Sequence, residues 1–455
     1  MTLIDAALLA GLLAVATWRL LAPRLGRGPR AVACVALVLL AGAQYALHGF
    51  TWQFVGGWLL LAAAALPVRQ AKMSTRIAGG LGLLVLMGAA VGPWALLPAP
   101  VLPEPRGPHE VGGVVLRWTD PTRPEDATAD PADRREVIVQ AWYPAGATRG
   151  ETLPYLDGLG RLPPKIMGIP RFVFRRYGEA DTFAQAGAQV ARSTQPWPVV
   201  VFSHGHGAAR AMYAGLLADL ASRGYVVLAV DHPYEAAVTQ LSDGRVVPFA
   251  LKDGGADDAR QAYMERQVLV RAADVRFVLD QLRRPAALGP VLAGRLDPTR
   301  VAVAGHSFGG ATAVLVASQD PRVRAAADID GMLYGDPRGE TFQGPLLLLE
   351  SGGTQTIGPY MEATQAVLSR VPASGWRYAI GGASHLSFTD LDFMLSPPGR
   401  WAAHQVVGGP RGAADTVRTT VDILDAFLRG PLKGQRGDVA AAAARHAEVR
   451  GGPAS

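Results

Sequence analysis

Hydrophobic residues crowd into the first hundred positions of the chain, where they form four long segments over residues 3–21, 31–50, 52–68 and 77–97. Each segment is close to the ~20 residues that a helix needs to cross a hydrocarbon core. A soluble helix of this length normally carries a polar stripe, and these segments have almost none. The pattern therefore predicts four membrane-spanning helices. The alternative is a buried bundle in a soluble protein.

Basic residues between the segments predict the orientation of the spans. Two loops are basic, whereas the loop over residues 48–51 has no Lys or Arg. Because basic loops stay in the cytoplasm, we expect the N-terminus and everything after residue 97 on the outer side of the cell membrane. The basic residues are Arg19, Arg24, Arg27 and Arg30 in one loop and Arg69, Lys72 and Arg76 in the other.

The composition changes at residues 98–110, where prolines recur and predict a stiff, extended linker. Beyond it, short apolar runs alternate with helical patterns, which predicts an α/β domain with a mostly parallel sheet. We therefore divide the chain into a transmembrane region (1–97), the linker, an α/β domain (111–430) and a disordered tail (431–455). The tail is rich in Gly and Ala and has few residues that would form a core.

The apolar runs of the α/β domain predict its strands and helices. Two insertions, 150–195 and 231–258, interrupt this alternation near the sheet edge at which such folds bind ligands, so we expect them to shape the mouth of a site. The expected strands are 114–118, 137–143, 198–203, 226–230, 301–304, 324–329, 345–350 and 376–380, and the expected helices are 210–222, 259–282 and 415–428.

One stretch of this domain carries a chemical motif. The strand over 301–304 runs into Gly-His-Ser-Phe-Gly at residues 305–309 and then into an Ala-rich helix at 311–318. This context is typical of a nucleophile elbow, a turn so tight that glycines must flank the serine, which leaves Ser307 Oγ exposed above the sheet. The alternative is an ordinary Gly-rich turn between a strand and a helix.

A serine hydroxyl becomes a nucleophile when a histidine takes its proton and an acid orients that histidine. His385 directly follows the last expected strand and is a better candidate base than His404, which lies beyond a Pro-Pro break. Asp330 and Glu350 each end a strand after the elbow helix, and both satisfy the chain order Ser, acid, His. The residue pattern leaves the choice between these two acids open.

The negative oxygen that forms when Ser307 attacks an ester needs N–H donors. We expect one from Phe308, which follows the nucleophile, and one from His206 in the Gly-rich loop at residues 203–207. The alternative use of this region is a metal site, but no further paired His or carboxylate completes one, so we expect no metal. Its candidate ligands are His204, His206, Asp231 and His232.

Overall composition excludes several other classes of protein. Cys34 is the only cysteine, which excludes an intramolecular disulfide, a Cys-rich zinc site and thiol-pair chemistry. The net charge of +6 arises largely from Arg and Lys beside the apolar segments and in the tail. No basic face points to nucleic acid. We expect no cofactor and no protein partner.

Several motifs, taken in order, resemble platelet-activating factor acetylhydrolases of the plasma type (isoform II). The resemblance covers residues 198–393 and is absent from the apolar region. The matching motifs are residues 203–207, Asp-Leu-Ala-Ser-Arg-Gly-Tyr at 219–225, Arg266-Gln267, residues 305–311, Ile329-Asp330 and the His385 loop.

The resemblance implies an α/β-hydrolase fold and calcium-independent cleavage of short or oxidised acyl groups from the sn-2 position of phospholipids. In that family the acid follows the strand after the elbow helix, which favours Asp330 over Glu350, and the oxyanion donors fall on His206 and Phe308. This chain departs from the family in its two insertions and in having His206 where the family has an apolar residue. Polyester and dienelactone hydrolases share parts of the pattern.

These observations predict a membrane-anchored serine esterase that acts on short or oxidised acyl esters of phospholipids. Ser307 is expected to attack the ester, His385 to act as the base, and Asp330 to orient the imidazole. The alternatives are a cutinase-, polyester- or dienelactone-hydrolase-like esterase of broader specificity, an acyltransferase, and a catalytically inactive lipid-binding module. The expected partners are the substrate and the lipid bilayer.

Overall fold

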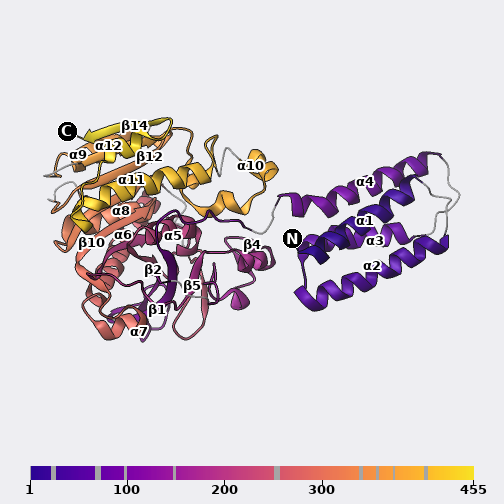
Figure 1. The fold of residues 1–455 in the computed structure, drawn as a ribbon, viewed down its shortest axis with the longest axis horizontal. Helices are drawn as coiled ribbons and strands as arrows, with labels where there is room; N and C mark the ends of the chain where they lie inside the picture. The colour runs from indigo at the N-terminus through magenta and orange to yellow at the C-terminus, as the bar shows by residue number, and fades with distance from the viewer. Residues whose placement is uncertain are drawn as a thin grey trace. The chain divides into compact units, whose positions relative to one another are not determined.

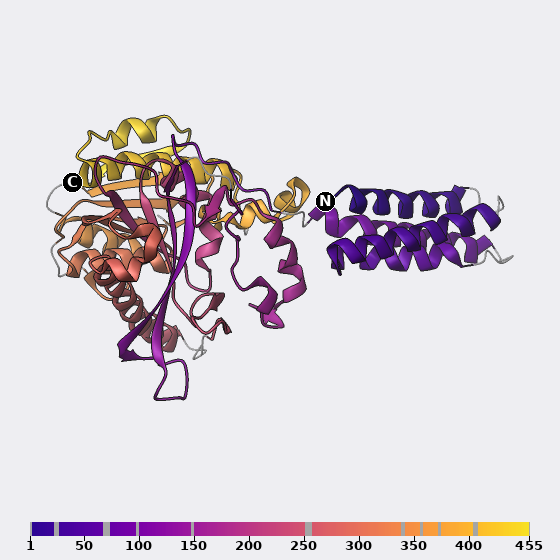
Figure 2. The ribbon, with the colours of Figure 1, turned by 60° about the horizontal axis from the view of Figure 1, so that its bottom comes forward.

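The computed structural model of the 455-residue chain describes residues 2–21, 27–66, 73–96, 100–146, 150–250, 257–337, 342–354, 358–371, 375–403 and 408–454. The chain forms two compact units. The first contains Met1–Pro100 and Met394–Ala402, and the second contains Val101–Phe393 and Ala403–Ser455. Figures 1 and 2 show the elements of each unit.

The first unit is built from apolar helices (Figure 1). Three of them are long and apolar enough to cross a membrane. Leu8, Leu12 and Leu60 are buried between the helices, while many other apolar side chains of this unit are exposed. The helices are α1 (Leu3–Leu21), α2 (Arg27–His48), the 3₁₀ turn η1 (Trp52–Phe54), α3 (Val55–Ala65) and α4 (Met73–Leu96), and the short α10 (Pro397–Ala403) follows much later in the chain.

The third predicted span, 52–68, is shorter in the structure than we expected. Turn η1 and helix α3 together cover Trp52–Ala65. At about 1.5 Å per residue they extend about 20 Å, less than the ~30 Å of a hydrocarbon core. The helix ends because Leu66, with φ −58° and ψ 142°, precedes Pro67, and a residue in that position avoids the helical conformation.

The second unit is organised around a ten-stranded sheet of order β14-β13-β12-β11-β10-β6-β7-β2-β1-β5. The strands from β13 to β7 are parallel, while the β7–β2, β2–β1 and β13–β14 pairs are antiparallel. The strands are β1 (Glu110–Pro124), β2 (Arg134–Ala145), β5 (Ala184–Ala186), β6 (Trp197–Ser203), β7 (Val226–Asp231), β10 (Leu296–His306), β11 (Val323–Ile329), β12 (Leu346–Ser351), β13 (Gly375–Ile380) and β14 (Val449–Ala454).

Helices cover the sheet (Figure 1), and its apolar side chains are buried beneath them. Helices α6 (Asp257–Gln281) and α8 (Phe308–Gln319) share one core with alternate residues of the central strands, such as Val201 and Val303. The other helices of this layer and of the opposite one are α5 (Ala214–Ser222), the short α7 (Gly289–Leu292), α9 (Gly358–Leu368) and α11 (Ala413–Lys433). The unit is thus a mixed α/β structure with a large, mostly parallel sheet, as the sequence predicted.

Both predicted insertions contain short elements that the sequence did not reveal. The first insertion contains the hairpin of β3 (Lys165–Ile166) and β4 (Ile169–Pro170), the 3₁₀ segment η3 (Arg171–Glu179) and the edge strand β5. The second contains a small hairpin of β8 (Val238–Gln240) and β9 (Val246–Pro248).

The expectation of a disordered tail over 431–455 is wrong for most of that segment. Helix α11 continues to Lys433, α12 covers Val439–Ala444, and β14 pairs with β13. An uncovered edge strand offers a row of unpaired backbone groups, and β14 satisfies those of β13 although its sequence, Val-Arg-Gly-Gly-Pro-Ala, has little strand propensity. The domain boundaries at 97, 110 and 430 stay predictions.

Candidate active site

The turn between β10 and α8 holds Ser307 in a strained conformation. Its φ of 57° and ψ of −124° are unusual for a residue with a side chain. A Cβ atom at Gly305 would collide with the carbonyl of Gly309, and one at Gly309 would collide with the carbonyl of Ser203. These two positions therefore require glycine, which is the physical basis of the Gly-x-Ser-x-Gly pattern.

Three predicted site residues are brought together at the carboxyl ends of the strands. His385 Nε2 lies 3.0 Å from Ser307 Oγ, and His385 Nδ1 lies 2.8 Å from Asp330 Oδ2. The network assigns the tautomer in which Nδ1–H donates to the carboxylate and Nε2 accepts from the hydroxyl. Asp330 is buried, whereas the His385 side chain is 48 % exposed, so this serine–histidine pair is open to a reactant.

The Asp330 carboxylate is held in an ionised state by its surroundings. Burial alone would raise its pKa, but the hydrogen bond and charge of His385, together with the hydrogen bonds from Ser351 and Thr354, outweigh this effect and lower the pKa below its ordinary value. Ser351 N–H and Thr354 Oγ1–H add hydrogen bonds of 2.6 and 2.7 Å to Asp330 Oδ1. The carboxylate is thus both charged and fixed in position.

Glu350, the other acid that the sequence left open, lies elsewhere. Its carboxylate accepts hydrogen bonds from Tyr360 Oη at 2.6 Å and from Arg377 Nε at 2.9 Å, and it is completely buried. Of the two alternatives, Asp330 contacts His385, and Glu350 is engaged by these other partners. The alternative base, His404, lies outside the described residues.

The loop that follows β6 lies directly beside the nucleophile. A Cβ atom at Gly205 would lie 3.3 Å from that of Ser307. Neither the Phe308 nor the His206 N–H takes part in a hydrogen bond within the described part of the chain. Both donors are thus unoccupied. Burial, assisted by the charge of Arg271, lowers the pKa of His206 to about 4, so its ring is neutral at pH 7.

Two of the histidines considered for a metal site, His204 and His232, have other partners. His232 uses both ring nitrogens, with Nε2 2.9 Å from Ser203 Oγ and Nδ1 2.8 Å from Asp274 Oδ2. His204 Nδ1 lies 2.7 Å from the carbonyl of Gly205. Within the described ranges, no group of three or more His, Cys, Asp or Glu is arranged to hold a metal ion.

Sequence reasoning missed a second Ser–His–Asp chain, formed by Ser203, His232 and Asp274. These three residues are 1 %, 0 % and 0 % exposed, and Arg135 Nη2 forms an ion pair of 2.7 Å with Asp274 behind them. Burial lowers the pKa of His232 to about 3, which keeps it neutral. These hydrogen bonds fix the start of the 203–207 loop. Ser203 itself is buried, so it is out of reach of a reactant.

Arg271 is another residue that the sequence analysis did not single out. Its completely buried guanidinium donates from Nη1 to the carbonyl of His204 at 2.6 Å and from Nε to Glu235 Oε2 at 2.9 Å. It also lies 4.7 Å from the ring centroid of Phe308. A signal was present, because its spacing from Val268 and Val275 puts this charge on the buried face of α6.

His306 links the 203–207 loop to the His385 loop. Tyr213 Oη accepts a hydrogen bond from Gly205 N–H at 3.0 Å and lies 2.9 Å from His306 Nδ1. On its other side, His306 Nε2 lies 2.9 Å from the carbonyl of His385. Burial lowers the pKa of His306 to about 3, so the neutral ring accepts from the tyrosine and donates to the carbonyl.

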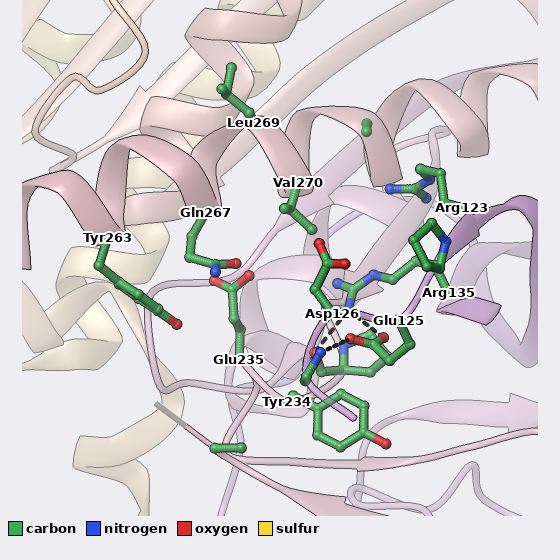
Figure 3. A pocket seen from close by; sticks show the side chains of 15 residues that line it. Arg123, Glu125, Asp126, Arg135, Tyr234, Glu235, Tyr263, Gln267, Leu269 and Val270 are labelled. Carbon is green, nitrogen blue, oxygen red and sulfur yellow. Dashed lines mark hydrogen bonds and ion pairs between the residues drawn. The ribbon is translucent and has the colours of Figure 1, made fainter. Parts of the chain in front are cut away.

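A cavity of about 450 Å³ lies between α6, the end of β1 and the segment after β7 (Figure 3). Glu235 and Gln267 line one side of it, while the ion pair of Arg135 and Glu125, 2.9 Å long, lies on another. Through Glu235 and Arg135 the cavity borders the buried network behind the 203–207 loop. Neither Ser307 nor His385 is among the described residues that line it.

Comparison with known families agrees with this geometry. A family model described as "Platelet-activating factor acetylhydrolase, isoform II" matches residues 97–284 and 289–430. This chain belongs to that family. The resemblance that the motifs indicated is thereby confirmed, and the acetylhydrolase match extends well beyond residues 198–393, over most of the chain.

The individual relatives have low sequence identity to this chain. The platelet-activating factor acetylhydrolase of Gallus gallus is 25 % identical over 328 residues, which cover 64 % of this chain and 75 % of the relative. A "probable 1-alkyl-2-acetylglycerophosphocholine esterase" of Arthroderma benhamiae is 22 % identical, covering 68 % and 80 %. A ferulic acid esterase structure from Streptomyces cinnamoneus is 31 % identical with a TM-score of 0.65, covering 78 % of this chain and 99 % of that one. This acetylhydrolase-family chain is therefore a hydrolase of the esterase type.

Proposed function

We propose that the chain is a membrane-anchored serine esterase whose second unit has an α/β-hydrolase fold. The observation that carries this proposal is the hydrogen-bonded series Ser307–His385–Asp330 at a strained turn between a strand and a helix. An imidazole with an open serine on one side and a charged carboxylate on the other is the arrangement that serine hydrolysis requires.

In the proposed reaction, His385 Nε2 takes the proton of Ser307 as Oγ attacks the ester carbonyl. The N–H groups of Phe308 and His206 stabilise the negative oxygen that develops, and removing such a donor typically slows turnover by a factor of about 10²–10³. The protonated His385 then gives its proton to the leaving alcohol. Water activated by the same imidazole releases the acid from the acyl-enzyme.

The proposed substrates are short or oxidised acyl esters of phospholipids. Family membership and the names of the relatives support this choice. A substrate can reach Ser307 from solvent, because the side chain of the neighbouring His385 is about half exposed. The broader esterases with parts of the same motif, and an inactive lipid-binding module, are the alternatives that a substrate series separates.

One further substrate class, esters of planar aromatic acids, is favoured by a specific observation. The His206 ring is surrounded by aromatic rings at centroid distances of 5.2 Å for Phe249, 6.2 Å for Tyr263 and 5.7 Å for Phe308. Such a cluster beside the oxyanion donors would stack against an aromatic acyl group. The likeness to a ferulic acid esterase points the same way.

The test is the rate of hydrolysis of an ester series from acetyl to long acyl chains, extended by a feruloyl ester, with Ser307→Ala as the background. We expect a rate that depends on Ser307, because loss of the nucleophile typically costs several powers of ten. A steep fall beyond short acyl groups would support the phospholipid acyl esterase. Preference for the feruloyl ester would select the aromatic alternative, and unchanged turnover in Ser307→Ala would rule out the mechanism.

The membrane anchor is part of the same proposal. The four apolar segments would cross the membrane, the linker at 98–110 would lead out of it, and the hydrolase domain over 111–430 would lie on the extracytoplasmic side. Three helices of suitable length and the basic residues of the loops support this arrangement.

A further inference from the structure

A second cavity, of about 510 Å³, lies at the opposite end of the sheet from Ser307. It is bordered by Trp197 at the start of β6, Gly224 just before β7, Arg300 in β10 and the end of α11 at Lys433. Strand β6 extends from this cavity to the loop beside Ser307, which is about 20 Å at ~3.3 Å per residue. The cavity is therefore separate from the proposed active site.

The walls of this cavity are basic. Among the described residues that line it there is no Asp or Glu, so the ionisable side chains that face the space are all basic. The basic residues are Arg106, His109, Arg223, Arg300, Arg429 and Lys433.

The guanidinium groups are fixed by carboxylates that lie behind the wall. Ion pairs of 2.6 to 2.7 Å join Arg106 to Asp219, Arg223 to Asp422, Arg429 to Asp425 and Arg300 to Asp297. Because these side chains are already held, little conformational entropy is lost when they meet a ligand. The acids orient the cations without entering the cavity.

Lys433 has no carboxylate partner in the ion pairs of the described residues. Its Nζ donates to the carbonyl of Arg223 at 2.7 Å and lies 3.7 Å from the ring centroid of Tyr225. Burial is the main reason that its pKa falls to about 8. Burial and then the charge of Lys433 also lower the pKa of His109. The charge of Asp425 offsets only part of this effect at Lys433. A negative ligand in the cavity would therefore further favour the charged forms of both groups.

We propose that this cavity binds a phosphate group. A phosphate offers several acceptor oxygens to lysine and to the planar forks of arginine, and it supplies the negative charge that the cavity lacks. The volume exceeds that of a single phosphate, so the phosphate can carry an organic part. It comes either from a small soluble phosphate or from a lipid head group.

The test uses the full chain in non-ionic detergent and measures binding by titration calorimetry. The probes are inorganic phosphate and monomeric dihexanoylphosphatidic acid, each compared with chloride at the same ionic strength, since salt screens non-specific attraction. We expect saturable binding of at least one phosphate probe and none of chloride. Binding of inorganic phosphate would identify a free phosphate as a sufficient ligand, and binding of the lipid alone would identify the head group. Binding of neither would overturn the proposal.

The variants are Lys433→Gln and, as the matched control, Lys165→Gln at an exposed lysine of β3. Loss of a charged hydrogen-bond donor should weaken binding about tenfold or more in Lys433→Gln, while Lys165→Gln and Lys433→Arg should keep it. Retained unfolding temperature without phosphate and retained ester hydrolysis verify the fold. His109→Gln, at a part-exposed position, is a second variant expected to weaken binding. Equal affinity in all variants would place the phosphate elsewhere and refute the site.

Discussion

In the part of the chain that the structure describes, two serines are each hydrogen-bonded to a histidine and, through it, to an aspartate. They differ in access and in backbone conformation. Ser307 stands at φ 57° beside two unoccupied N–H donors, whereas Ser203 ends strand β6 and is 1 % exposed. A reactive serine needs space for its substrate and N–H donors for the developing charge. The two serines should therefore differ in reactivity, although both are linked to a histidine and an aspartate.

This difference predicts the labelling of single variants by a fluorophosphonate probe. Ser307→Ala should lose labelling, while Ser203→Ala should keep it, because a buried serine meets no reagent. Loss of the Ser203 hydroxyl leaves His232 Nε2 without its partner. The free energy of unfolding of this variant should therefore fall by about 1–3 kcal/mol, which lowers its unfolding temperature. Labelling that survives in Ser307→Ala and disappears in Ser203→Ala would reverse the assignment.

Asp390 predicts a specific dependence of stability on pH. Burial raises the pKa of this carboxyl to about 7, although Gly215 N–H and Tyr155 Oη donate to it. Its folded-state pKa lies above the ordinary value of about 4, so the folded protein holds the proton more tightly than the unfolded chain. Stability should therefore fall as pH rises from about 4 to about 7 and should then change no further through this group.

The comparison variant is Asp390→Asn, which resembles the protonated acid and does not titrate. Between pH 5 and pH 8 the wild type should lose roughly 2–3 kcal/mol relative to this variant, which corresponds to several degrees in unfolding temperature. Unfolding followed by tryptophan fluorescence at both pH values measures this. A constant difference between the two proteins would show that Asp390 keeps the same protonation state across the range.

The sequence identified Ser307, His385 and Asp330 because each directly follows a strand, and the carboxyl ends of parallel strands meet at one edge of a sheet. The structure brings the three together, and their catalytic roles stay a prediction. The choice of Asp330 over Glu350 came from the family resemblance, because both residues end neighbouring strands. Side-chain contacts such as that of Glu350 with Arg377 depend on the packing of distant segments, so residue order could not reveal them.

At the scale of elements, the pairing of strand β14 can be tested by single substitutions, because its two adjacent glycines differ in their surroundings. Gly451 has φ 135°, and a Cβ atom there would collide with the carbonyl of Arg377, whereas nothing lies within 4 Å of a Cβ atom at Gly452. Gly451→Ala should therefore separate β14 from β13 and lower the unfolding temperature, while Gly452→Ala should change it little. Amide hydrogen exchange of β13 would report the loss of pairing directly.

Equal effects of the two alanines would mean that the collision at Gly451 is relieved without loss of pairing.

Strand β14 also illustrates why part of the fold could not be predicted from the sequence. The central strands β6, β7 and β10 are apolar runs between turn signals, so their pattern sufficed to predict them. Strand β14 has no such pattern, since its place is determined by the free edge of β13, a contact between segments that are far apart in the chain.

For the whole molecule, the open question is the side of the membrane on which the proposed hydrolase unit lies. The answer depends on helix α3. If Trp52–Ala65 does not cross, three spans remain, and the second unit lies on the opposite side from the N-terminus. The basic residues argue that it does cross, because Arg76 and its neighbours in the loop before α4 belong on the same, cytoplasmic side as Arg30. Two loops on the same side must be separated by an even number of crossings, so both α2 and α3 would have to cross.

Local thinning of the bilayer accommodates a short span at a cost of fractions of a kcal/mol per Å, whereas a reversed basic loop contradicts the charge rule. We therefore predict four crossings. Alkaline phosphatase, active outside, and green fluorescent protein, fluorescent inside, would each be fused after Phe50 and after Gly107. Four crossings require phosphatase activity at both positions. Three crossings would give phosphatase activity at Phe50 and fluorescence at Gly107, which would put the hydrolase unit in the cytoplasm and make its substrates lipids of the inner face.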